Sequence, residues 1–160
     1  MIERTPYTAL ISEVATEFGL PADLLEAQVL VESGGDPNAF RYEHSFYTKY
    51  LRDNEKAVAR RYGPIAACSC GLLQIVVEVA YELGFEGRPE DLFTDRIGLH
   101  WGARKMRALW AWAGGLEADY PKALSAYNGG ARHAVGPPFP NQTYVDRIYR
   151  LTGRTSEVTR

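Results

Sequence analysis

Apolar side chains recur at helical spacing along most of this chain. The i, i+3, i+4 spacing predicts a first helix from Tyr7 to Phe18, which Gly19 ends. Pro21 suits the first turn of a second helix, and apolar residues wrap most of that helix, so we expect it to be central and buried. Further helices are predicted over residues 47–62, 71–83, 95–113, 119–127 and 141–152.

The segment 71–83 admits two interpretations. Its residues 75–77 are β-branched and would suit a strand, but the apolar spacing across the whole segment favours a helix. The pattern contains no repeat, no heptads and no second core. It therefore predicts a single all-α domain of about six or seven helices over residues 1–160, with a polar and mobile tail at 154–160.

Small and polar residues refine the later helices. Gly98 and Gly102 lie four residues apart in the longest helix and permit close helix packing. Asn141 is the expected cap of the last helix, which Gly153 ends. Glu78 follows Gln74 by one turn in the segment 71–83, and we expect it to be a surface residue.

Composition excludes several classes of protein. Hydrophobic residues make up 46% of the 160 residues and the net charge is -2, which fits a globular domain and argues against nucleic-acid binding. Residues 1–6 lack the apolar core of a signal peptide, and no stretch approaches a membrane span. Cys68 and Cys70 are too close for a relaxed disulfide, so we expect small buried residues or free thiols.

Glu32 is the first candidate for chemistry. It ends the nearly all-apolar run 24–31 and is followed by Ser33 and two glycines. Burial and the negative end of a helix both disfavour a charged carboxylate, so both are expected to raise its pKa toward the range that a general acid needs. On position alone, the alternative is a solvated glutamate at a helix end.

Three further motifs follow Glu32-Ser33 in a fixed order. They are Gly-Leu-Leu-Gln-Ile at 71–75, Ala-Tyr-Asn-Gly-Gly at 126–130, and Tyr144 within Tyr-Val-Asp-Arg-Ile. In this order they resemble the soluble lytic transglycosylase catalytic domain, which has a goose-type-lysozyme-like fold. That family shows a Glu-Ser motif, a Gly-Leu-Met-Gln motif, an Ala-Tyr-Asn-x-Gly motif and a late tyrosine. The likeness covers nearly the whole chain, from about residue 10 to residue 151.

The resemblance implies a reaction on peptidoglycan. Such enzymes cleave the β-1,4 bond between N-acetylmuramic acid and N-acetylglucosamine. Their glutamate protonates the glycosidic oxygen and then acts as a base while the muramic acid's own 6-hydroxyl attacks C1, which leaves a 1,6-anhydro end. Carried over, Glu32 has both roles. One acid suffices because the substrate supplies the nucleophile, whereas ordinary glycosidases use two carboxyl groups.

The same resemblance implies a set of substrate-binding residues. Ser33 is expected to position the acid or a substrate N-acetyl group, or else only to cap its helix. Gln74 offers a donor and an acceptor to sugar amides, or else makes a core hydrogen bond. Tyr127 and Asn128 precede two glycines, which let a ligand approach the backbone closely. Tyr144 is expected to hydrogen-bond Glu32, with a core aromatic as the alternative.

The stretch 34–70 departs from the family pattern. It is longer than in compact relatives, and its Phe-Arg-Tyr-Glu-His run at 40–44 looks like a pattern in phage-encoded members. Glu43 in this run is the best candidate for a second acid, and the neighbouring aromatic residues suit sugar contacts. Asp36, in an Asp-Pro-Asn turn, is a weaker candidate.

No cofactor or metal is expected, since His44, His100 and His133 are scattered along the chain. The expected partners are peptidoglycan glycan strands, joined by other virion or cell-wall proteins if the chain is phage-encoded. The expected place of action is the cell wall, in the periplasm or outside the cell. Without a signal peptide, a virion component or a lysis protein made in the host cytoplasm fits this best. The alternatives are a bacterial cytoplasmic precursor and a domain cut from a larger chain.

Two rival functions remain open at the level of the sequence. The first is a hydrolytic muramidase on the same fold, in which Glu43 or another acid places a water. The second is a catalytically silent glycan-binding or virion-structural domain, against which the intact Glu32-Ser33 pair argues.

Overall fold

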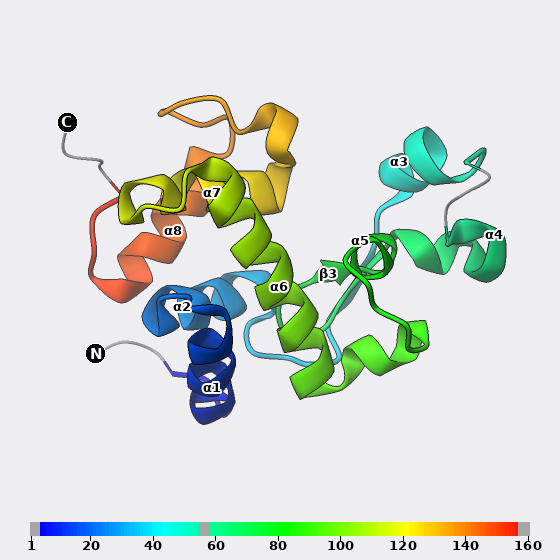
Figure 1. Cartoon of the computed structure of the whole chain (residues 1–160), viewed down its shortest axis with the longest axis horizontal. Helices are drawn as coiled ribbons and strands as arrows, with labels where there is room; N and C mark the ends of the chain where they lie inside the picture. The colour runs from blue at the N-terminus through cyan, green and yellow to red at the C-terminus, as the bar shows by residue number, and fades with distance from the viewer. Residues whose placement is uncertain (1–3, 55–57, 157–160) are drawn as a thin grey trace. The chain divides into compact units, whose positions relative to one another are not determined.

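The chain is described by a computed structural model that covers residues 4–54 and 58–156. It divides into two compact units, of which unit 1 is Met1–Val31 with Ala103–Arg160 and unit 2 is Glu32–Gly102. Within the described residues there are eight α-helices and one small sheet, so the predicted mainly helical fold is confirmed (Figure 1). The single domain over residues 1–160 stays a prediction.

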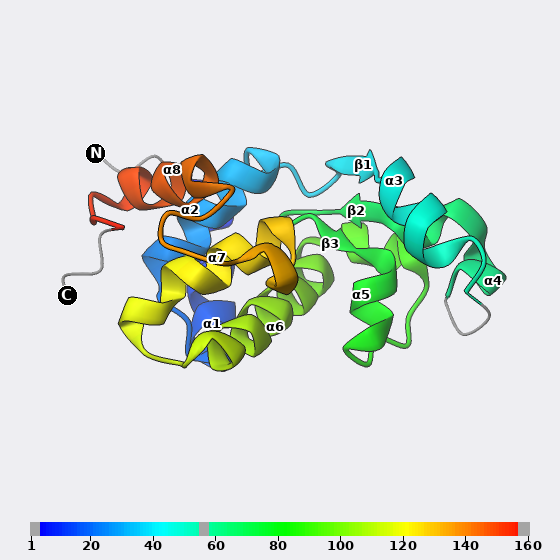
Figure 2. The ribbon, with the colours of Figure 1, turned by 90° about the horizontal axis from the view of Figure 1, so that it is seen from above.

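Unit 1 is helical in the part of the chain that the structure describes. Figures 1 and 2 both show α2 between α1 and α8 in this unit. Its elements are α1 (Thr8–Phe18), most of α2 (Ala22–Ser33), the second half of α6 (Asp95–Ala113), η4 (Glu117–Asp119), α7 (Tyr120–Gly129), η5 (Ala131–His133) and α8 (Gln142–Thr152). The predicted helix stops are confirmed, because Gly19 and Gly153 hold the left-handed conformation at the ends of α1 and α8, with φ of 62° and 72°.

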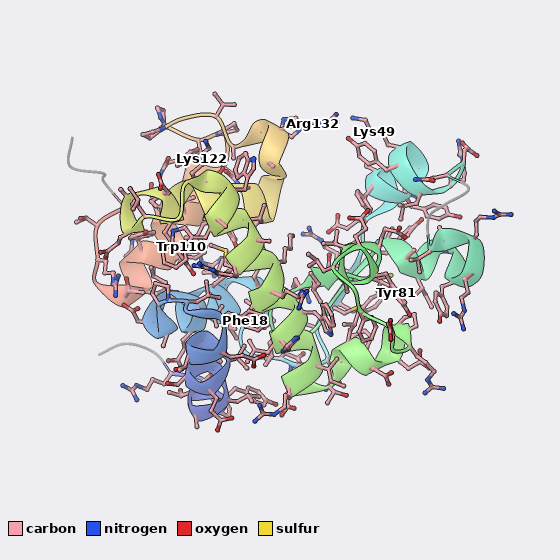
Figure 3. The ribbon with its side chains drawn as sticks, viewed as in Figure 1. Phe18, Lys49, Tyr81, Trp110, Lys122 and Arg132 are labelled. Carbon is pink, nitrogen blue, oxygen red and sulfur yellow. The ribbon has the colours of Figure 1, made fainter. Side chains whose placement is uncertain are left out.

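The core of unit 1 forms around the buried helix α2. This helix buries residues around most of its circumference, as its sequence predicts. Tyr120 at the start of α7 is fully buried. Its ring meets the ring of Trp110 of α6 edge-on, at 5.1 Å between centroids. Trp110 is labelled in Figure 3. Other core side chains of this unit are Ile11, Val14, Met106, Leu124, Val145 and Ile148.

Unit 2 contains a three-stranded antiparallel sheet in the order β1-β2-β3. Its strands are β1 (Phe40–Tyr42), β2 (Cys68–Cys70) and β3 (Ile75–Val76). Phe40 pairs with Cys70, and Ser69 pairs with Val76. The other elements are α3 (His44–Phe46), η1 (Tyr47–Leu51), α4 (Ala59–Tyr62), η2 (Gly63–Ala67), α5 (Val77–Glu82), η3 (Pro89–Phe93) and the first half of α6.

The predicted helix over 71–83 is wrong in its first half. Residues 71–74 form a turn, Ile75 and Val76 form β3, and the helix begins only at Val77. The β-branched pair pairs with β2, and Ile75 packs in an apolar cluster with Phe85 and Leu92, beside α5 (Figure 2). Burial on a pleated surface therefore outweighed the helical spacing.

The predicted helix over 47–62 is interrupted. The structure has a π-helical turn at Tyr47–Leu51 and a short α-helix at Ala59–Tyr62, while residues 55–57 lie outside the described residues. Leu51, Ala66 and Ala67 form a small buried cluster under these turns. The segment is therefore folded onto its own small core instead of forming one long helix.

Cys68 and Cys70 are free and buried, as expected. Burial, assisted by the neighbouring thiol of Cys68, raises the pKa of the Cys70 thiol to about 12. The thiol is therefore protonated at neutral pH and behaves as a small apolar side chain.

The start of the predicted tail is tied to unit 1. The guanidinium of Arg154 pairs with Asp23 at 2.8 Å and with Glu117 at 3.2 Å, and Ser156 donates a hydrogen bond to Asp146. Residues 157–160, the rest of that tail, lie outside the described residues.

Candidate active site

Glu32 is the penultimate residue of α2 and is half-buried. The hydroxyl of Ser33 donates a hydrogen bond to the Leu72 carbonyl at 2.8 Å and accepts one from the Gly35 amide at 3.2 Å. These bonds join the end of α2 to the turn at 71–74. Because the single hydroxyl proton of Ser33 is used on Leu72, this side chain can offer a ligand only an acceptor.

Gln74 lies in the turn and not on a helix face, which corrects the expected setting of this residue. Its φ of 48° is in the left-handed region, where residues other than glycine are uncommon. Its Nε2 donates hydrogen bonds to the carbonyls of Ala39, at 2.9 Å, and Gly71, at 3.0 Å. The side-chain amide thus holds the turn against the strand segment before β1, and such local strain is often found at ligand sites.

Gly71 makes this turn possible. It has φ of 74°, and a Cβ built there would lie 2.8 Å from the Leu92 carbonyl oxygen. Its amide donates to the same Ala39 carbonyl that accepts from Gln74. Glycine is therefore favoured at the first position of the predicted motif for two reasons: the positive φ and the lack of space for a Cβ.

Glu43 lies directly after β1, and its carboxylate is already paired. It accepts a hydrogen bond from Nε of Arg41 at 2.7 Å, and the Ser69 hydroxyl lies 3.4 Å away. Its side chain is 30% exposed. These two contacts hold the Glu43 carboxylate in place beside the end of β1.

Glu78 is buried, so the expected surface position is wrong. Only 6% of it is exposed, and its carboxylate accepts a hydrogen bond from the Val58 amide at 2.8 Å. Burial raises the pKa of Glu78, and the charge of Glu82 raises it further, against the lowering by the Val58 hydrogen bond. Glu78 thus fixes the start of α4 from α5.

This burial predicts a pH dependence of folding stability. Because the folded protein holds the Glu78 proton more tightly than the unfolded chain, stability should fall as pH rises from 4.5, the ordinary pKa, through the raised one. Glu78→Gln should remove this decline while keeping an acceptor for Val58. The measurement is urea unfolding across that range, with exposed Glu86→Gln as the control. Parallel curves for wild type and Glu78→Gln would contradict the prediction.

In unit 1, Tyr127 is buried near the end of α7 and is covered by a cation. The Nζ of Lys105 lies 3.8 Å from the centroid of the Tyr127 ring and donates to the Tyr127 carbonyl at 3.0 Å. Only 5% of Tyr127 is exposed. The lysine therefore fixes both the ring and the last turn of α7.

Asn128 is exposed and is held by Asn141. Nδ2 of Asn141 donates to the Asn128 side-chain oxygen at 2.9 Å and to the Ser125 carbonyl at 3.0 Å. The Ser125 hydroxyl in turn donates to Oδ1 of Asn141 at 2.6 Å. Asn141 precedes α8 as predicted but its side chain does not cap that helix, because it fixes the end of α7 instead.

Tyr144 of α8 contacts a residue that the sequence analysis missed. Nε2 of Gln28 in α2 donates a hydrogen bond to the Tyr144 hydroxyl oxygen at 3.3 Å. Gln28 is fully buried in a mostly apolar stretch of α2, four residues before Glu32. A glutamine in an apolar run was the available signal, since a buried amide needs a partner.

The structure therefore joins the predicted residues in two sets. In unit 2, Ser33 and Gln74 meet through the turn at 71–74, and Glu43 lies at the far end of β1. In unit 1, Tyr127 and Asn128 end α7, and Tyr144 contacts Gln28. No group of three or more potential metal ligands occurs within the described residues.

Comparison with known protein families decides the family. The family model described as the transglycosylase SLT domain matches residues 9–136. The chain belongs to the transglycosylase SLT domain family. The matched range of this SLT domain contains Glu32, Ser33, Glu43, Gln74, Tyr127 and Asn128, whereas Tyr144 follows it. A search of curated proteins found no match.

Membership sets the general function of this SLT domain. It is a peptidoglycan enzyme of the class that cleaves glycosidic bonds, and its substrate is peptidoglycan. Among the described residues, no helix has the length and apolar character needed to cross a bilayer. The roles of the individual site residues stay predictions.

Proposed function

We propose that this SLT domain is a lytic transglycosylase that cleaves the MurNAc-β-1,4-GlcNAc bond and leaves a 1,6-anhydromuramic acid end. Family membership supports the reaction class. The observation that carries the proposal is Glu32 at the end of α2, half-buried, with the adjacent Ser33 anchoring that helix end to Leu72. An acid needs a fixed position relative to the bond that it protonates, and this anchor supplies one.

In the proposed reaction, Glu32 first donates its proton to the glycosidic oxygen as the bond to C1 breaks. The resulting carboxylate then accepts the proton of the muramic acid 6-hydroxyl while that oxygen attacks C1. The proton balance closes with no water consumed. Gln74 is the proposed contact for a sugar amide: both of its described hydrogen bonds are donated by Nε2, which leaves Oε1 as an acceptor for an N–H group.

The remaining predicted residues are proposed to contact the glycan or to position the groups that do. Tyr127 and Asn128 present the end of α7 to the glycan, and the bonds from Lys105 and Asn141 hold that end in one conformation. Tyr144 is proposed to donate a hydrogen bond through its hydroxyl group. Ser33 is a positioning residue, since its hydroxyl bonds to the protein. Glu43, paired with Arg41, is the proposed sugar contact near β1.

We expect product analysis to test the reaction type. Purified peptidoglycan digested by the protein should yield muropeptides with 1,6-anhydromuramic ends, whose mass is one water below that of the reducing-end products. Liquid chromatography with mass spectrometry measures this difference, and a known hydrolytic muramidase provides the control digest. Reducing-end products alone would identify a hydrolase, in which case Glu43→Gln should also abolish clearing.

The proposed place of action is the cell wall. The Phe-Arg-Tyr-Glu-His run at 40–44 supports a phage-encoded protein that acts as a virion component or a lysis protein. In a virion, other virion proteins would be its partners.

A further inference from the structure

Gln28 combines complete burial with incomplete hydrogen bonding. None of its surface is exposed, and its described side-chain bond is the one that Nε2 donates to the Tyr144 hydroxyl. Its Oε1 is buried and has no hydrogen-bond partner among the described residues. A buried amide in this state destabilises the fold relative to an apolar side chain of the same shape.

The direction of the bond is set by the amide nitrogen, which faces the phenol. Nε2 of Gln28 donates one of its N–H groups to the Tyr144 oxygen, so the phenol oxygen is the acceptor of this bond. The hydroxyl proton of Tyr144 is therefore not used on Gln28.

A buried amide that lowers stability in a mostly apolar part of a helix is the kind of local exception that functional sites contain. The neighbours of Gln28 on α2, Leu24, Leu25 and Val29, have no exposed surface. An apolar residue at position 28 would continue that pattern. What the amide adds is a single fixed donor to the Tyr144 oxygen.

We propose that Gln28 is a positioning residue for Tyr144: it fixes the phenol ring and leaves the phenol proton for donation in the active site. This inference rests on the proposed function, because that function places Tyr144 in the site. Gln28 acts on the reaction only through the Tyr144 hydroxyl. Its effect on the rate therefore exists only when that hydroxyl is present.

The test is a double-mutant cycle with Gln28→Met and Tyr144→Phe. Methionine keeps the length and volume of glutamine and removes the donor. Gln28→Met should lower the turnover of soluble peptidoglycan fragments about tenfold with little change in KM, and should leave Tm unchanged or higher. In the Tyr144→Phe background, Gln28→Met should lower the turnover no further.

Tyr149→Phe is the matched control, because it removes a hydroxyl from a buried tyrosine of the same helix. In the Tyr149→Phe background, Gln28→Met should still lower the turnover about tenfold. An undiminished loss in the Tyr144→Phe background would overturn the proposal. So would a wild-type rate for Gln28→Met.

A second measurement covers the case in which Gln28→Met alone fails to fold. Tyr144→Phe leaves the buried Nε2 without its acceptor, so it should lower Tm, and the double variant should recover most of that loss. Additive losses in Tm would overturn the proposal. Failure of the proposed function is seen separately, in the products of the wild-type digest, since the cycle needs only a rate of bond cleavage.

Discussion

Replacing Glu32 by glutamine should lower cell-wall clearing by about 10²- to 10⁴-fold while the protein stays folded. Glutamine has nearly the shape of glutamate, but it can neither donate the proton to the glycosidic oxygen nor accept the one from the 6-hydroxyl. Because both steps use the same carboxyl group, we expect the loss to lie at the upper end of that range. Turbidity of purified cell walls gives the rate, and circular dichroism with thermal unfolding reports the fold.

The matched control is Glu43→Gln, which changes the other candidate acid in the same way. In the proposed mechanism it should weaken substrate binding and lose much less activity, since Glu43 is paired with Arg41. Equal losses for the two variants would favour the two-acid hydrolytic reaction. A Glu32→Gln protein that clears walls at the wild-type rate would rule out the acid-base role and favour a binding domain or a different acid.

The second large effect is expected for stability, at Gly98 in α6. A Cβ built there would lie 2.3 Å from the carbonyl oxygen of Leu92. That oxygen belongs to backbone and cannot move away as a flexible side chain would, so Gly98→Ala must displace η3 or α6. We expect a loss of about 2–3 kcal/mol of unfolding free energy, which corresponds to roughly 4–12 °C in Tm.

The sign of the change in unfolding free energy distinguishes a steric clash from helix propensity. Helix propensity alone predicts that Gly98→Ala should stabilise α6 by about 1 kcal/mol. The control is Ala108→Gly at an exposed position of the same helix, which measures that propensity term in the absence of a clash. Urea unfolding of both variants suffices. A Gly98→Ala protein that matches or exceeds the stability of the wild type would show that the close approach to Leu92 is not maintained.

The long helices were predictable because their signals are local and repeated. α1, α6 and α8 each carry several turns of apolar spacing, and each ends at a glycine in a predictable place. The sheet was not predictable in this way. β3 has two residues and β2 has three, which is too short for a periodic pattern to distinguish a strand from a helix.

The site shows the same division between local and distant information. Motif order placed Glu32, Gln74, Tyr127 and Tyr144 among the candidates, but it did not indicate which atoms hold them. Gln74 bonds to Ala39, thirty-five residues earlier in the chain, and Gln28 bonds to Tyr144, one hundred and sixteen residues later. Such pairings depend on which segments fold together, and a single sequence does not report them.

By itself, then, the sequence determined the long helices and the family. Helical spacing and glycine stops act over a few residues, and the order of the short motifs can be recognised without knowledge of the fold. Only the tertiary structure decided that 71–76 is a turn and a strand, that Glu78 is buried, and that Asn141 fixes α7 instead of capping α8. In each of these cases the free energy comes from burial or hydrogen bonding against a distant segment, and it exceeds the small local preferences that the sequence displays.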